Sequence, residues 1–113
     1  MSHFTIPTTS YTKRMFRGRR VRVFPERVTL TFINLGGEEM GQVTCDHFIA
    51  IGHAVRACPP VWPTVAETAI KIVYEDRVVW EYDPRPEDAY FTPGMGLSSL
   101  GIADGAVLTV VWC

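Results

Sequence analysis

The sequence predicts an α+β domain: a mixed sheet of four or five strands covered by one helix, with a basic N-terminal extension. Two patterns carry this prediction. Several short segments alternate apolar and polar residues, which is typical of half-buried strands. One longer segment repeats apolar residues every three or four positions, which is typical of an amphipathic helix. Because one helix stands against several strands, we expect it to cover one face of the sheet.

The first two strands are expected to form a hairpin. Residues 28–32 alternate apolar and polar side chains, and residues 38–43 fit a weaker returning strand. The intervening residues 34–37 contain Asn and two Gly, which adopt the positive φ of tight turns. Residues 20–23 alternate too, so the basic extension is expected to end in a strand.

A single helix is expected over residues 44–58. Thr44 is a suitable N-cap, since its hydroxyl can accept a hydrogen bond from the first helical turn. Pro59 and Pro60 then end the helix. One apolar face results from the positions Phe48, Ile51, Val55 and Cys58.

The second half of the chain is expected to supply the remaining strands. Residues 59–67 are too rich in proline for a helix or a central strand. The segments that follow are a strand at 69–74, a tight turn at 75–77, a strand at 78–82, a long loop at 83–96, a short helical turn at 97–100 and a last strand at 106–112.

Charge divides the chain into two parts. Residues 1–27 contain seven basic residues and one acid, a net charge of +6, whereas residues 28–113 carry a net charge of −7. We therefore expect a flexible basic arm at residues 1–20 and a folded domain at residues 21–113. The arm's candidate binding residues are Lys13, Arg14, Arg17, Arg19, Arg20 and Arg22.

Three interpretations of the arm stay open. It is a solvated tail, a basic patch for phosphates or an acidic partner, or a mitochondrial presequence rich in Arg, Ser and Thr. Residues 1–19 have too few periodic apolar positions for a packed element, so we expect their removal to leave folding intact. A secretory signal is not expected, because the apolar segment of such signals is missing, and a cytoplasmic, nuclear or mitochondrial location follows as the expectation.

The closing segment resembles a ubiquitin-like domain of the β-grasp fold. The residues that carry the resemblance are Leu97, Leu100-Gly101-Ile102, Asp104-Gly105, Leu108 and Val110. In that superfamily a short turn leads through a polar-Gly pair into the last strand, and the first and last strands lie side by side at the sheet centre. The resemblance implies that Leu100 and Ile102 enter the core and that Gly105 takes a positive φ.

The resemblance is to a member that is not conjugated. Conjugated modifiers end in a flexible Gly-Gly tail, whereas residues 110–113 here are Val-Val-Trp-Cys. Members without the tail are adaptor or docking domains. Examples are the ubiquitin-fold domain of modifier-activating enzymes, which recruits a conjugating enzyme, and docking domains of spliceosomal proteins.

No catalytic, cofactor or metal site is expected. Cys45, His47, His53 and Cys58 would point in different directions on one helix, and four ligands on one helix cannot surround a tetrahedral zinc ion. The Walker spacing, the nucleophile elbow and the deaminase signature are missing from the sequence. The sequence therefore indicates no enzyme and no small-molecule substrate.

The candidate partner-binding residues are Trp80, Glu81, Tyr82 and Asp83. Trp80 and Tyr82 share one face of their strand, and an exposed pair of aromatic rings would anchor a partner. The alternative is that Trp80 belongs to the core and Val79 faces outward. Glu81 and Asp83 begin an acidic segment that continues to Asp88. Two interpretations of this segment stay open, a solvated loop and an acidic surface for a basic partner.

The expected function is that of a non-catalytic module which binds other proteins within a larger complex. The alternative is a protein associated with nucleic acid, in an RNA complex, whose basic arm contacts phosphates. No membrane partner is expected, because the chain has no apolar run of about 20 residues.

Overall fold

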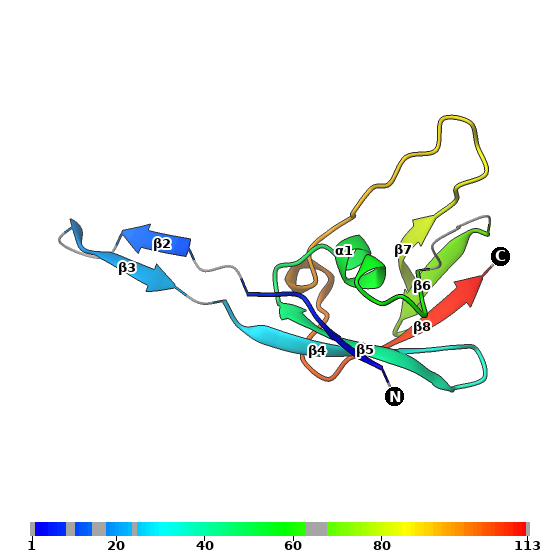
Figure 1. Cartoon of the computed structure of the whole chain (residues 1–113), viewed down its shortest axis with the longest axis horizontal. Coiled ribbons are helices and arrows are strands. Elements are labelled where there is room, and N and C mark those ends of the chain that lie inside the picture. The colour runs from blue at the N-terminus through cyan, green and yellow to red at the C-terminus, as the bar shows by residue number, and fades with distance from the viewer. Residues whose placement is uncertain (1, 9–10, 15–17, 24, 63–67, 113) are drawn as a thin grey trace.

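A computed structural model describes residues 2–8, 11–14, 18–23, 25–62 and 68–112. It is an α+β structure with one mixed six-stranded sheet, in the order β1-β5-β4-β8-β6-β7, and a separate two-stranded ribbon, β2-β3 (Figure 1). The elements are β1 (His3–Thr5), β2 (Tyr11–Arg14), β3 (Arg20–Val23), β4 (Arg27–Ile33), β5 (Glu39–Asp46), α1 (Ile51–Arg56), β6 (Ile70–Tyr74), β7 (Arg77–Tyr82), a 3₁₀ turn (Ser98–Leu100) and β8 (Val107–Trp112). Within these residues, no helix has the length and apolar character needed to cross a membrane.

The centre of the sheet is formed by two strands from opposite ends of the domain. β4 pairs with β8 in parallel, with Phe32 beside Leu108. On one side of this pair β5 is antiparallel to β4, and on the other β6 is antiparallel to β8 and to β7. The expected hairpins at residues 28–43 and 69–82 are both present.

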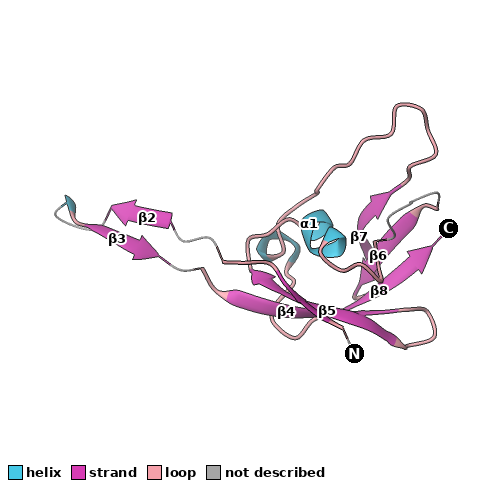
Figure 2. Cartoon of the chain, in the orientation of Figure 1, coloured by secondary structure: helices cyan, strands magenta, loops and turns pink. Residues whose placement is uncertain are grey.

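The alternation in the sequence predicts which residues of β4 are buried, and the same inward positions are buried in β8. Val28, Leu30 and Phe32 of β4 are buried, and so are Leu108 and Val110 of β8. α1 and the loop 83–96 lie on this side of the sheet (Figure 2). The core is therefore a single layer between the sheet and the one helix of the described residues.

The helix is shorter than the sequence predicts. It spans Ile51–Arg56 and does not begin at Thr44, because β5 continues to Asp46. Thr44 lies opposite Thr29 in the sheet, and the two hydroxyls share a hydrogen bond of 2.9 Å. Phe48 is 44% exposed, so the prediction that it belongs to the core face is wrong.

The number of strands is also higher than predicted. Residues 3–5 were expected in a flexible arm, yet they form β1, which pairs in parallel with residues 42–44 of β5. The backbone NH of Ile6 donates to the Thr44 carbonyl at 2.9 Å, and Phe4 and Ile6 pack against the core. Three residues are too few to show a period of two, so this strand could not be recognised from its residues alone.

The closing segment has the expected turns. Leu97 and Ile102 are buried, whereas Leu100 packs at the edge of the core and is only partly buried. Gly101 and Gly105 have φ values of 74° and 84°, a region that side chains disfavour. The backbone NH of Thr29 donates to Asp104 Oδ1 at 2.7 Å, so this turn is bonded to the central strand.

Candidate interaction surfaces

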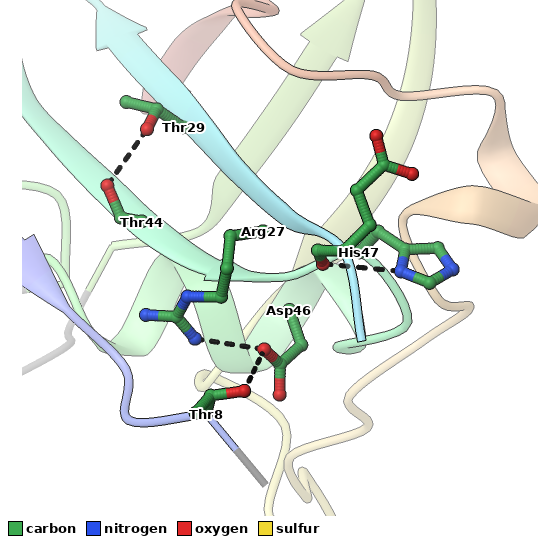
Figure 3. Close-up of polar contacts among 7 residues, drawn as sticks. Thr8, Arg27, Thr29, Thr44, Asp46 and His47 are labelled. Atoms are coloured by element: carbon green, nitrogen blue, oxygen red, sulfur yellow. Dashed lines mark hydrogen bonds and ion pairs between the residues drawn. The ribbon is translucent and has the colours of Figure 1, made fainter. Parts of the chain in front are cut away.

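The first candidate surface is the β2-β3 ribbon, and a buried carboxylate lies at its base. The ribbon lies between Thr8 and Arg27 in the chain, and both of these residues donate to Asp46 Oδ1 at 2.9 Å (Figure 3). Next to them the His47 NH donates to the Glu26 carbonyl at 2.9 Å. The two ends of the ribbon are therefore attached to the end of β5.

The environment of Asp46 is strongly desolvated. The Asp46 side chain is fully buried, whereas that of Arg27 is 31% exposed. The neighbouring Cys45 is buried as well, and burial raises the pKa of its thiol to about 11, with Arg27 opposing and Asp46 adding to the increase. Burial also raises the pKa of the Cys58 thiol. Neither thiol is a reactive nucleophile at neutral pH.

The ribbon carries most of the basic residues singled out in the sequence. Lys13 and Arg14 lie on β2, Arg20 and Arg22 lie on β3, and Arg19 directly precedes β3. Arg19, Arg20 and Arg22 are exposed. Arg17 lies outside the described residues.

Trp80 lies in the core, so its interpretation as an exposed anchor is wrong. It is 6% exposed, and its Nε1 donates to the Thr92 carbonyl at 2.8 Å. Tyr82 stacks on it with a centroid distance of 6.3 Å and an interplanar angle of 9°. Trp62 and Phe91 complete the aromatic cluster, at centroid distances of 6.1 and 5.8 Å from Trp80. The prediction that Trp80 and Tyr82 share one face of β7 is confirmed, whereas the sequence did not decide whether that face points to the core or to solvent.

The loop 83–96 is fixed over α1 by backbone hydrogen bonds. The NH groups of Ile51 and Gly52 donate to the carbonyls of Met95 and Pro93, at 2.9 and 2.8 Å. A side chain at Gly52 would place its Cβ 2.8 Å from the Pro93 carbonyl oxygen, so only glycine fits. The loop thereby closes the helix side of the sheet.

Glu81, Tyr82 and Asp83 do not share one surface. Tyr82 is partly buried on the helix side, and the alternation of β7 directs Glu81 to the other side, beside Lys71 of β6. Asp83 forms a bidentate pair with Arg85, at 2.8 and 2.9 Å, and the hydrogen bonds from Arg85 lower the pKa of Asp83 to about 2. A hollow of about 420 Å³ adjoins these residues. The acidic segment is thus partly neutralised by its own arginine.

The second candidate surface is the sheet face opposite α1, called here the uncovered face. It comprises the alternate positions of four adjoining strands, and its residues are Thr31, Lys71, Val73, Glu81, Val107, Thr109 and Val111. Val107 is 50% exposed, and Thr31, Val73, Thr109 and Val111 are partly exposed. Sequence reasoning missed this face, because β-branched residues occur on both sides of β8.

The described residues show no arrangement for metal chemistry. Across residues 2–8, 11–14, 18–23, 25–62 and 68–112, no three His, Cys, Asp or Glu side chains gather as ligands of a metal ion would. Comparisons of the chain with protein-family models, with curated proteins and with solved structures find no match.

Proposed function

We propose that this chain is a non-catalytic, ubiquitin-like module of the β-grasp fold that docks another protein on its uncovered face. The strand order β5-β4-β8-β6-β7 supports the fold assignment, with the parallel pair β4 and β8 at the centre. The turn from Leu97 to Gly105 supports it as well, since its two glycines have positive φ. β1 extends this arrangement at one edge.

The observation that carries the proposal is the contrast between the two faces of the sheet. One face is filled by α1 and the aromatic cluster, while the other exposes a continuous row of β-branched residues. Exposed apolar surface that lies together on one face is typical of protein interfaces. Lys71 and Glu81 lie opposite each other at its border and would supply the polar rim of such an interface.

The partner class we propose is a conjugating enzyme of a ubiquitin-like pathway, which the chain would recruit as an adaptor. This follows from the resemblance of residues 97–110 to the ubiquitin-fold domain of modifier-activating enzymes.

The test is a titration of the ¹⁵N-labelled chain with a panel of conjugating enzymes, followed by NMR. We expect the shifts to concentrate on β4, β6 and β8. Val107→Lys should weaken binding at least tenfold, because it places a charge among the exposed β-branched residues of the proposed contact. Leu35→Lys is the matched control, since Leu35 is 75% exposed in the turn between β4 and β5 and is not one of the seven residues of the uncovered face.

Two outcomes would refute the proposal. One is that no enzyme of the panel shifts the residues of the uncovered face. The other is that Val107→Lys and Leu35→Lys bind equally well while both retain the melting temperature of the native chain.

A further inference from the structure

We propose that the β2-β3 ribbon is an arm that binds the phosphate backbone of double-stranded DNA in the major groove. β2, β3 and the adjoining Arg19 carry five basic residues, four of them arginines, and no acid. Arginine presents a planar fork of donors that matches the oxygens of a phosphate. This inference is independent of the docking function proposed for the uncovered face.

The register of the ribbon places like charges next to each other. Arg14 lies opposite Arg20, and Thr12 lies opposite Arg22, so the positions of all three arginines share one face. Residues directly opposite in an antiparallel pair have their Cβ atoms about 5 Å apart, and like charges at that separation destabilise the pair. A polyanion bound along this face would remove the repulsion.

The ribbon is also unsupported by other elements. Among the described residues it is a separate two-stranded sheet, and Figure 1 shows it projecting from one end of the molecule. An isolated two-stranded hairpin is only marginally stable in water. We therefore expect a polyanion bound along the arginines to stabilise this free-standing ribbon.

The ribbon is connected to the six-stranded sheet through contacts at its base. Thr8 and Arg27 attach its two ends to Asp46, and β1 holds the preceding residues in the sheet. The rest of the chain, residues 28–113, carries a net charge of −7 and would repel phosphates. The projection therefore allows the ribbon to reach a polyanion while the acidic part stays away from it.

The shape of the ribbon favours DNA over RNA. Paired strands lie about 4.8 Å apart, and the B-form major groove, about 12 Å wide, admits a two-stranded ribbon. The major groove of A-form RNA is deep and narrow and does not admit such an element. An acidic protein segment would match the charge but offers neither the groove nor the spacing of phosphates.

The experiment is fluorescence anisotropy of the full chain with a labelled 20-base-pair DNA duplex, at NaCl concentrations between 50 and 200 mM. We expect affinity to fall steeply with salt, because each contacted phosphate contributes about −0.9 to the slope of log K against log salt. The triple variant R19Q/R20Q/R22Q should reduce that slope by about 2 to 3. The variant R19K/R20K/R22K should retain most of it, since the charges remain.

The matched controls distinguish binding by the ribbon from attraction by any positive charge on the protein. Arg20→Gln and Arg85→Gln each remove one positive charge, and only Arg20→Gln should weaken binding, because Arg85 is paired with Asp83 outside the ribbon. Hydrogen exchange of the amides at residues 20–23 should slow when DNA is added. Circular dichroism melts should show the same melting temperature for all variants, since Arg19, Arg20 and Arg22 are exposed.

Three results would overturn the inference. The first is an unchanged salt slope in R19Q/R20Q/R22Q. The second is an affinity for an RNA duplex of equal length that matches the affinity for DNA. The third is equal or tighter binding of poly-glutamate, which would assign the ribbon to an acidic protein partner.

Discussion

Arg27 and Asp46 form an ion pair whose two members differ in exposure. Nη1 of Arg27 lies 2.9 Å from Oδ1 of Asp46, with the carboxylate fully buried and the arginine side chain 31% exposed. A buried charge without a counter-charge is costly, whereas a partly exposed one can be solvated by water. The two halves of this pair should therefore differ in what their removal costs.

We predict that Arg27→Gln destabilises the protein more than Asp46→Asn does. The first change leaves a buried carboxylate without this cation and should cost about 3 to 5 kcal/mol. The second leaves a guanidinium that can turn toward water, and should cost about 1 to 2 kcal/mol. Urea unfolding of both variants measures the difference, and equal costs would show that the carboxylate does not depend on Arg27.

A second prediction concerns Gly52, a helical glycine for which the usual effect of alanine should be reversed. In most helices Gly→Ala is stabilising by about 0.5 to 1 kcal/mol. Here the added Cβ would lie 2.8 Å from the Pro93 carbonyl oxygen and 2.9 Å from Trp80 Nε1.

Gly52→Ala should therefore destabilise the chain by about 1 to 3 kcal/mol and shift tryptophan fluorescence, because the loop must move away from α1. Ala54→Gly is the matched control within the same helix. It should cost about 1 kcal/mol through the lower helix propensity of glycine, and the lost methyl contact adds to this cost. A more stable Gly52→Ala protein would mean that the loop 83–96 is not fixed over the helix.

The sheet and its hairpins could be predicted from the sequence, because the alternation of apolar and polar residues in a strand can be recognised within a few neighbouring residues. Residues 28–32 alternate, and the buried residues of β4 are the apolar members of that alternation. The last strand was predicted instead from the high β propensity of residues 106–112. The turn at Asp104-Gly105 was also recognisable, since few residues other than Gly adopt its positive φ.

The errors arose where tertiary contacts override local preference. Thr44 has the chemistry of an N-cap, but pairing with Thr29 extends β5 beyond it and shortens the helix. β1 exists because an open edge of β5 accepts it, and no pattern within residues 3–5 reveals that. The sequence pattern around Trp80 is the same whether its face of β7 is covered or exposed. The position of α1 and Phe91 therefore decides whether Trp80 is buried.

A third prediction separates the apolar residues of the closing turn. Leu97 is fully buried and Leu100 is only partly buried, although the resemblance implied that Leu100 enters the core together with Ile102. Leu97→Ala should cost about 2 to 5 kcal/mol, and Leu100→Ala should cost clearly less. Leu35→Ala, at an exposed turn position, should change stability by under about 0.5 kcal/mol. Chemical denaturation of the three variants ranks them, and a larger loss for Leu100→Ala would contradict the observed packing.

The last prediction is an alkaline loss of stability caused by Cys45. Its pKa is raised from 9.0 in the unfolded chain to about 11 in the fold, mainly because burial disfavours the thiolate. Between pH 9 and pH 11 the folded chain consequently keeps the Cys45 proton that the unfolded chain has released. The contribution of this thiol to the free energy of unfolding is therefore fully present below pH 9 and declines as the pH rises toward 11. The loss from this group should reach roughly 2 kcal/mol, and Cys45→Ala should lack it.

Urea unfolding at pH 8, 9, 10 and 11 measures this loss in a Cys113→Ser background, which leaves Cys45 and Cys58 as the thiols. In that background both should react with a thiol reagent far more slowly in the folded than in the unfolded chain, since burial raises the pKa of each. Cys45→Ala serves as the reference for all other groups that titrate at high pH, the Cys58 thiol included. Parallel decline of the two proteins from pH 9 to 11 would show that the Cys45 thiol ionises as readily in the fold as outside it, and would contradict its burial beside Asp46.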